Sequence, residues 1–160
     1  MALGTEEASQ EPFPDKDKAL YEQIKPRLFF VGPPKSGKTS ILQVLFYDMH
    51  ATETLYLQPT AAVTGYHMSV GIDIYDYPGN NGVDGGILLP DPNYYYSSRC
   101  AVVFVIDAQD DVLHQTSYLM EAAYQAYSAH IGIKFFVFLH KIDGLSEELK
   151  QGTWSFYSDW

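Results

Sequence analysis

From Arg27 onwards, the hydrophobic positions of the chain form short continuous runs separated by stretches with helical spacing. Three runs are typical of strands buried on both faces: RLFFV at 27–31, AVVFVIDA at 101–108 and KFFVFL at 134–139. A weaker pattern at 61–66 and the alternating SVGIDIYDY at 69–77 predict two more strands.

Helical spacing follows the first two of the continuous runs. Residues 39–49 are predicted to form a helix with an apolar face made of Ile41, Leu42, Leu45, Phe46 and Met49. A later helix is predicted to have its apolar face at Leu113, Met120, Ala123 and Tyr127. Strands that alternate with helices in this way predict an α/β fold with a mostly parallel sheet flanked by helices.

The region before this pattern has a different texture. Residues 1–26 are rich in Glu, Asp, Lys and Pro and lack a sustained apolar period, which predicts a flexible acidic tail. A short helix is expected within it, over 17–24.

Composition narrows the possible partners. Asp and Glu number 20 against 10 Lys and Arg, so the formal net charge is −10 and a nucleic-acid partner is not expected. The apolar runs are too short to cross a bilayer, and no signal peptide begins the chain. We therefore expect a cytoplasmic protein without direct membrane insertion.

The sequence GPPKSGKT, from Gly32 to Thr39, has the spacing of a phosphate-binding loop and lies between a predicted strand and a predicted helix. Its two prolines have no N–H, but they precede the donors expected to wrap the phosphates, which run from Lys35 to Ser40. Lys38 is expected to bridge the outer phosphates and Thr39 to bind Mg²⁺. The residues predicted to bind nucleotide here are Gly32, Lys35, Ser36, Gly37, Lys38, Thr39 and Ser40.

Two further motifs also end predicted strands. Asp76 begins DYPG, in which the acid is expected to hold Mg²⁺ through water and the N–H of Gly79 to meet a γ-phosphate. His140, Lys141 and Asp143 form HKID, similar to the N-K-x-D of GTP-binding proteins. The carboxylate can accept two hydrogen bonds from guanine, while the lysine stem packs on the base.

These motifs, in this order, resemble the Rag/Gtr branch of the Ras-like GTPases, and within it the Rag C/D type. The resemblance runs from about Arg27 to Lys150 and rests on ETLYLQPT, DYPG, VIDAQDD and HKIDGLSEELK. It implies a Ras-like P-loop NTPase domain over 27–150 that binds GTP or GDP with Mg²⁺. It also implies that Thr60 reaches Mg²⁺ and the γ-phosphate in the GTP state.

Membership of this family further implies a cellular role. Such a protein acts as a heterodimer with a Rag A/B-type partner in nutrient (amino acid) signalling to the TOR pathway. It is recruited to the lysosomal or vacuolar surface.

The chain also departs from the family pattern. Asn80 stands where many members have glutamine to orient the attacking water, so with Thr60 and Asn80 as the catalytic pair we expect slow hydrolysis. The insert that follows, including the tyrosines at 94–96, does not match the family. We expect residues 151–160 to match no family segment and the last strand and helix of the fold to be missing, which would leave the strand at 134–139 as an exposed edge.

Two alternatives stay open on sequence grounds. A P-loop kinase or ATPase would use the same phosphate loop with adenine nucleotides. A truncated relative could instead act as an interaction protein that no longer binds nucleotide.

Overall fold

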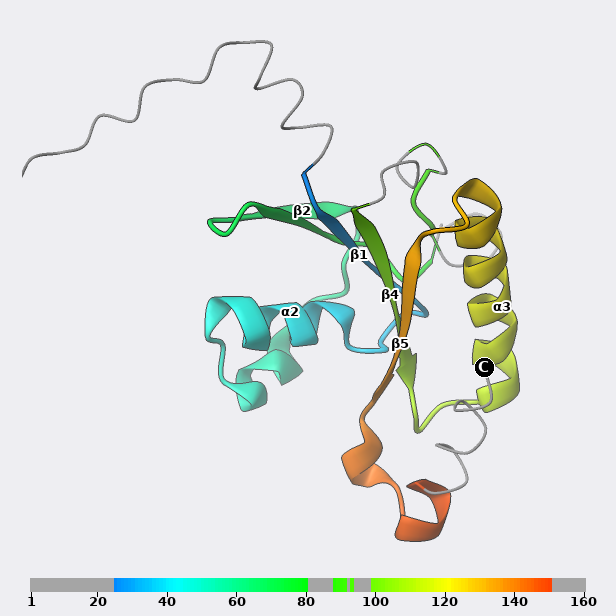
Figure 1. Cartoon of the computed structure of the whole chain (residues 1–160). Helices are drawn as coiled ribbons and strands as arrows, with labels where there is room; N and C mark the ends of the chain where they lie inside the picture. Colours follow the sequence, from blue (N-terminus) through cyan, green and yellow to red (C-terminus); the bar gives the residue numbers. More distant parts are fainter. Residues whose placement is uncertain (1–24, 81–87, 92, 94–98, 151–160) are drawn as a thin grey trace, which may run out of the picture.

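The computed structural model describes residues 25–80, 88–91, 93 and 99–150 (Figure 1). Its elements, in chain order, are β1 (Arg27–Val31), α2 (Lys38–Tyr47), η1 (Ala51–Tyr56), β2 (Thr64–Met68), β3 (Ile72–Asp76), β4 (Cys100–Asp107), α3 (Val112–Ala129), β5 (Lys134–His140) and η3 (Ile142–Gly144). The expected acidic tail and its helix, the tyrosines at 94–96 and the segment 151–160 lie outside the described residues.

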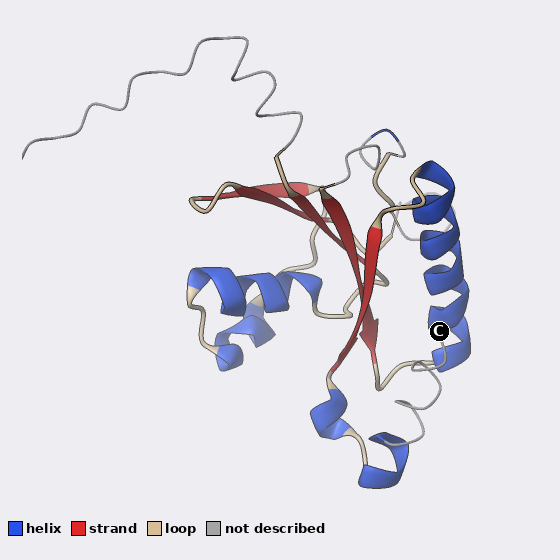
Figure 2. Cartoon of the chain, viewed as in Figure 1, coloured by secondary structure: helices blue, strands red, loops and turns tan. Residues whose placement is uncertain are grey.

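The strands form a five-stranded sheet in the order β2-β3-β1-β4-β5. β1 pairs in parallel with β3 and β4, and β4 pairs in parallel with β5, whereas β2 runs antiparallel to β3. Helix α2 and the short η1 lie on one face of the sheet, and α3 covers the other (Figures 1 and 2). The predicted α/β class and the mostly parallel sheet are therefore confirmed.

Alternating side chains of the central strands form two cores. Phe29 and Phe104 belong to the core beneath α3, while Phe30, Val103 and Leu42 belong to the core beneath α2. All five side chains are at most 3% exposed. Because β1 and β4 are buried on both faces, their sequences read as continuous apolar runs rather than alternating ones.

The strand predicted over 69–77 is shorter than expected. β3 begins only at Ile72, because Ser69 to Gly71 form the turn of a β2–β3 hairpin. Gly71 adopts a φ of 78° and donates its N–H to the Met68 carbonyl at 2.9 Å. That left-handed backbone favours glycine, so the turn ends the alternation at this position.

The apolar face predicted for the second long helix is wrong. Leu113, Met120 and Tyr127 are 78%, 45% and 48% exposed. Helix α3 instead buries Leu119, Ala122 and Ala126, together with Gln115. The small alanines let the helix approach the sheet closely, so a face rotated by about one residue meets the core, while the larger apolar side chains point outward.

The predicted face of α2 is only partly correct. Leu42 is buried at 1% exposure, whereas Leu45 and Phe46 are 63% and 39% exposed. Leu45 lines the cavity described below rather than the core.

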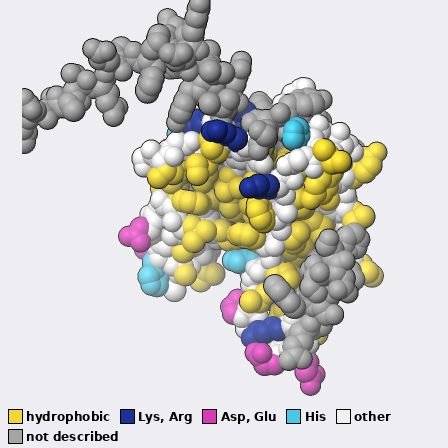
Figure 3. Space-filling model, in the orientation of Figure 1, with side chains coloured by type: hydrophobic (Ala, Val, Ile, Leu, Met, Phe, Trp, Pro, Cys, Tyr) yellow, Lys and Arg dark blue, Asp and Glu magenta, His cyan; other side chains and the backbone are white. Residues whose placement is uncertain are grey.

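Within the described residues, β5 lies at the edge of the sheet, as expected. Phe136, Val137 and Phe138 are between 38% and 46% exposed. In the view of Figure 3, hydrophobic side chains gather where Figure 1 shows the β5 edge of the sheet. In the part of the chain that the structure describes, none of the helices is both long and apolar enough to span a membrane.

Candidate nucleotide-binding site

A cavity of about 1010 Å³ opens at the end of the sheet where the parallel strands have their carboxyl ends. Its walls come from the loop after β1, the first turns of α2, the η1 segment, and the loops after β3, β4 and β5. Open α/β sheets bind ligands at this end, because loops from several strands converge there. The volume lies at the upper end of the range found for small-molecule sites.

The loop between β1 and α2 is packed too tightly for side chains at its glycines. A Cβ on Gly32, whose φ is 137°, would lie 2.4 Å from the Val105 carbonyl oxygen. Gly37, with a φ of 98°, has the ring of His140 in the place where a Cβ would project. The glycines of the motif therefore allow the backbone to curl against β4 and β5.

The prolines of this loop contact the loop after β3. A Cβ on Gly79 would lie 2.3 Å from the Cα of Pro34, so the two backbones meet without side chains between them. Pro33 and Pro34 thus form a rigid surface against which Gly79 packs.

Lys38, the lysine of the motif, begins α2 and is only 5% exposed. Its Nζ donates to the carbonyl oxygens of Gly32 and Pro33, both at 2.8 Å. Burial lowers the pKa of Lys38 to about 8, an effect that the nearby Asp76 carboxylate partly offsets. The ammonium group is therefore held by two neutral carbonyl oxygens. Charged phosphate oxygens form stronger hydrogen bonds with an ammonium group and could replace them.

Three polar side chains meet beside this lysine. The hydroxyl of Thr39 donates to Oδ2 of Asp76, and the hydroxyl of Thr60 lies 2.7 Å from that of Thr39 and 3.3 Å from the same carboxylate oxygen. Burial raises the pKa of Asp76, while Thr39, Lys38 and Thr60 act in the opposite direction.

The other oxygen of Asp76 indicates whether a cation fits this cluster. Asp76 is fully buried, and its Oδ1 has no hydrogen-bond partner among the described residues. A buried carboxylate oxygen without a partner is costly, and a hydrated cation beside it would satisfy it. Two hydroxyls and a carboxylate are oxygen donors of the kind that Mg²⁺ prefers, so the donor set fits this ion.

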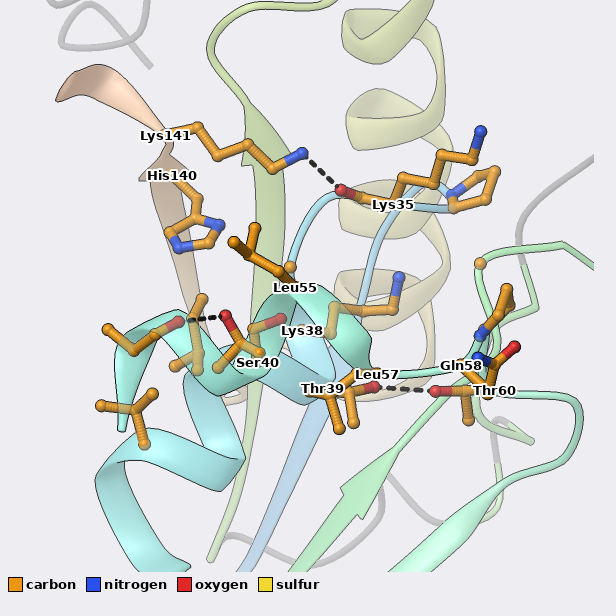
Figure 4. Close-up of a pocket in the computed structure, with 18 of the residues that line it drawn as sticks. Lys35, Lys38, Thr39, Ser40, Leu55, Leu57, Gln58, Thr60, His140 and Lys141 are labelled. Carbon is orange, nitrogen blue, oxygen red and sulfur yellow. Dashed lines mark hydrogen bonds between the residues drawn. The ribbon is translucent and has the colours of Figure 1, made fainter. Parts of the chain in front are cut away.

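The opposite end of the cavity carries the HKID residues. Nζ of Lys141 donates to the Lys35 carbonyl at 2.8 Å and pairs with Oδ2 of Asp107 at 2.6 Å, which stretches its stem across the cavity wall (Figure 4). Asp143 lines the cavity and is exposed to solvent. A planar base lying on the Lys141 stem would therefore have a carboxylate near its edge.

His140, which was expected to contact nucleotide, has a partner in the protein as well. Its Nδ1 donates to the Ser36 carbonyl at 2.8 Å, so this ring nitrogen carries a proton. The contact fastens the end of β5 to the phosphate loop. His140 still lines the cavity through the rest of its ring.

Most of the site residues predicted from the sequence line this one cavity. They are Lys35, Gly37, Lys38, Thr39, Ser40, Thr60, Gly79, Asn80, His140, Lys141 and Asp143. Gly32, Ser36 and Asp76 are buried behind the cavity wall instead. Three lysines, Lys35, Lys38 and Lys141, line the cavity against one lining carboxylate, although Asp107 pairs with Lys141 and Asp76 lies behind the wall near Lys38. This balance suits an anionic ligand.

Sequence reasoning missed an apolar wall of the cavity. It is formed by Ile41, Val44 and Leu45 of α2 and by Leu55 and Leu57 in and after η1. The η1 segment is fixed at its start by a capping box, in which His50 and Glu53 exchange side-chain and backbone contacts. Figure 4 shows Leu55 reaching from η1 toward the middle of the cavity. Because histidine stands where the capping-box pattern has Ser or Thr, the sequence HATE did not indicate this start.

Gln109 was also missed. It follows β4, lines the cavity, and donates its side-chain amide to the Lys141 carbonyl at 2.8 Å. Gln109 lies within VIDAQDD, one of the stretches that carry the family resemblance, but the resemblance assigned no role to this residue.

The order of the strands, with the phosphate loop after β1, the acid at the end of β3 and the base motif after β5, places this domain in the Ras-like class of P-loop proteins. Comparison with known families narrows the class, because the model described as "Gtr1/RagA G protein conserved region" matches residues 27–157. The chain belongs to this family of G proteins.

Individual relatives indicate the branch. The chain is 35% identical to the Ras-related GTP-binding protein D of Mus musculus over 149 residues, 88% of this chain and 32% of the relative. It is 39% identical to the GTP-binding protein gtr2 of Schizosaccharomyces pombe, over 81% of this chain and 42% of the relative. It is 35% identical to the Ras-related GTP-binding protein C of Homo sapiens, over 82% and 34%.

These relatives make the chain a member of the Rag C/D type within the family. The matched region spans about a third to two fifths of the length of these relatives.

Proposed function

We propose that this chain binds GDP and GTP together with Mg²⁺ and acts as a guanine-nucleotide switch. The observation that carries the proposal is the convergence of Lys38, Thr39, Thr60 and Asp76 at one end of a cavity whose other end presents Lys141 and Asp143. A ligand with phosphates at one side and a base at the other would place its two parts at these two ends of the same cavity.

At the phosphate end, the backbone from Lys35 to Ser40 would supply N–H donors at the start of α2, where the helix dipole favours negative charge. Lys38 would exchange its two loop carbonyls for the outer phosphate oxygens. Mg²⁺ would be held by Thr39, Thr60 and Asp76, and when bound it neutralises phosphate charge.

At the base end, Asp143 would accept hydrogen bonds from the ring N–H and the exocyclic amine of guanine. Adenine has no such pair of donors on one edge, so the carboxylate favours guanine. The Lys141 stem, which Lys35 and Asp107 hold in place, would pack against the plane of the base.

Hydrolysis of GTP by this chain alone is proposed to be slow. Asn80 lines the cavity next to Gly79, where its amide could orient water, but its side chain is one methylene shorter than glutamine. Pro34 also lines the cavity and presents a rigid ring there. Bound GTP would then be converted to GDP slowly unless another protein assists.

The role of the whole protein is proposed from the family to which the chain belongs. We propose a heterodimer with a Rag A/B-type GTPase that acts in nutrient signalling to the TOR pathway. Recruitment to the lysosomal or vacuolar surface would occur through partners.

A competition titration tests the nucleotide proposal. A fluorescent GDP analogue bound to the purified chain should be displaced by GDP and GTP at concentrations at least about 100-fold lower than those needed for ADP and ATP. Chelation of Mg²⁺ should weaken GTP binding more than binding of guanosine. Equal displacement by adenine nucleotides would favour the kinase or ATPase alternative, and no binding of the analogue would favour a pure interaction protein.

A further inference from the structure

A hydrogen bond joins two loops of the cavity that are far apart in the sequence. The side-chain amide of Gln109, in the loop between β4 and α3, donates to the backbone carbonyl of Lys141, just after β5, at 2.8 Å. Both residues line the cavity. The contact acts on the backbone of the turn that carries Asp143.

That turn begins in an unfavourable conformation. Lys141 has a φ of 59°, in the left-handed region that residues other than glycine rarely adopt. Such a conformation persists only where surrounding contacts hold it. Nζ of Lys141 is bound to Asp107 and Lys35, but these contacts lie at the far end of a flexible side chain. The Gln109 amide, in contrast, restrains the Lys141 peptide group directly.

Gln109 is itself well fixed. Its backbone N–H donates to Oδ1 of Asp107 at 3.0 Å, and Oδ2 of the same carboxylate pairs with Lys141. On its other side, a Cβ added to Gly144 would lie 2.4 Å from Nε2 of Gln109. The Gln109 side chain therefore lies against both ends of the turn from Lys141 to Gly144.

We propose that Gln109 is a positioning residue for guanine selectivity: it holds the turn from Lys141 to Gly144 so that Asp143 faces the base. The inference rests on the proposed guanine-nucleotide function. Gln109 acts through the backbone of this turn. Without its side chain, Lys141 can leave the left-handed conformation, and the Asp143 carboxylate is no longer held in one position. Lys38, which would bind the outer phosphate, is held by the carbonyls of Gly32 and Pro33 rather than by this turn, so we expect its contacts to be kept.

Two ratios of affinity separate this role from a general loss of structure. Inosine diphosphate lacks the exocyclic amine of guanine, so the preference for GDP over IDP reports how well Asp143 is placed. GMP lacks the outer phosphate, so the preference for GDP over GMP reports the phosphate loop. Gln109→Ala removes the side chain, and Gln109→Glu keeps its size but removes the donor.

Both variants should lower the preference for GDP over IDP by about fivefold, the usual value of one hydrogen bond, and leave the preference for GDP over GMP unchanged. Gly144→Ala should produce the same loss by displacing the Gln109 amide, and should add nothing when combined with Gln109→Ala. Gln125→Ala serves as the matched control, since this α3 glutamine contacts Glu121 and does not line the cavity.

An unchanged GDP-over-IDP preference in both Gln109 variants would overturn the inference. Equal weakening of GDP, IDP and GMP would also overturn it, because Gln109 would then have a general structural role. Failure of the proposed function looks different, since the unmutated chain would then show no preference for GDP over ADP.

Discussion

The hydroxyl oxygens of Thr39 and Thr60 lie 2.7 Å apart, although 21 positions separate the two residues in the sequence. Thr39 belongs to the phosphate loop and Thr60 follows the η1 segment, so this contact connects these two walls of the cavity. Both hydroxyls also lie within hydrogen-bond distance of the same Asp76 carboxylate oxygen, so three oxygen donors from three segments gather at one point of the cavity.

Two residues of the phosphate loop, Lys38 and Pro33, are expected to contribute differently to GDP binding. Lys38→Ala should weaken GDP binding by about 100-fold or more, because the outer phosphate loses a charged hydrogen-bond donor. Pro33→Ala should change affinity by less than about threefold, since alanine keeps the carbonyl that Lys38 contacts and proline never supplied an N–H. Calorimetric titration with GDP measures both. Comparable losses in the two variants would contradict the assigned roles.

The pH dependence of binding follows from Lys38. Because burial lowers the pKa of this lysine to about 8 in the free protein, its charge is lost as the pH rises above 8. A phosphate that binds the charged form raises the pKa again, so binding requires proton uptake and GDP affinity should fall by about tenfold per pH unit above 8. GMP, without the outer phosphate, is the control ligand. Parallel pH profiles for GDP and GMP would exclude Lys38 as the cause.

The apolar wall gives a further prediction with a matched control. Leu55 and Tyr56 are 81% and 82% exposed, yet only Leu55 lines the cavity. Leu55→Ser should speed GDP release by about tenfold, because a leucine covering the ligand would lose its apolar contact. Tyr56→Ser should leave release unchanged. Stopped-flow displacement of a fluorescent GDP analogue compares the two, and equal effects would show that Leu55 does not cover the nucleotide.

Much of this architecture could be predicted from local sequence. The continuous apolar runs at β1 and β4 identified strands buried on both faces, and the motif residues at the carboxyl ends of the strands lie close together, as expected. The run at β5 identified a strand, but this strand is partly exposed at the edge of the sheet rather than buried on both faces. Thr39, Asp76 and Lys141 could be proposed from the sequence because ligand chemistry restricts which residue types can stand at those motif positions.

Other features depended on tertiary packing. The buried face of α3 could not be predicted from hydrophobic periodicity, because it includes Ala122 and Ala126, whose small side chains are weakly hydrophobic but let the helix pack closely against the sheet. Leu55 looks like any exposed apolar residue until η1 folds against α2. Gln109 acquires its role only through Lys141, which is 32 positions away in the sequence.

The proposed slow hydrolysis can be tested at Asn80. Asn80→Gln should raise the single-turnover rate of GTP hydrolysis by about tenfold or more, because the longer side chain brings the amide closer to the attacking water. Gln125→Asn, which also changes an amide side chain by one methylene but does not line the cavity, serves as the control. A rate in the unmutated chain as high as in Asn80→Gln would contradict a limiting role for this side chain.

The central claim is that Asp143 reads a guanine base at the end of a nucleotide cavity. Asp143→Asn exchanges a carboxylate for an amide, which can donate to the extra carbonyl of xanthine but no longer accepts both guanine hydrogen bonds. Competition between GDP and xanthosine diphosphate for a fluorescent nucleotide analogue, measured for the unmutated chain and for Asp143→Asn, is the most direct measurement. The account predicts a strong preference for GDP in the unmutated chain and a reversed preference in the variant. The same preference in both proteins would contradict it.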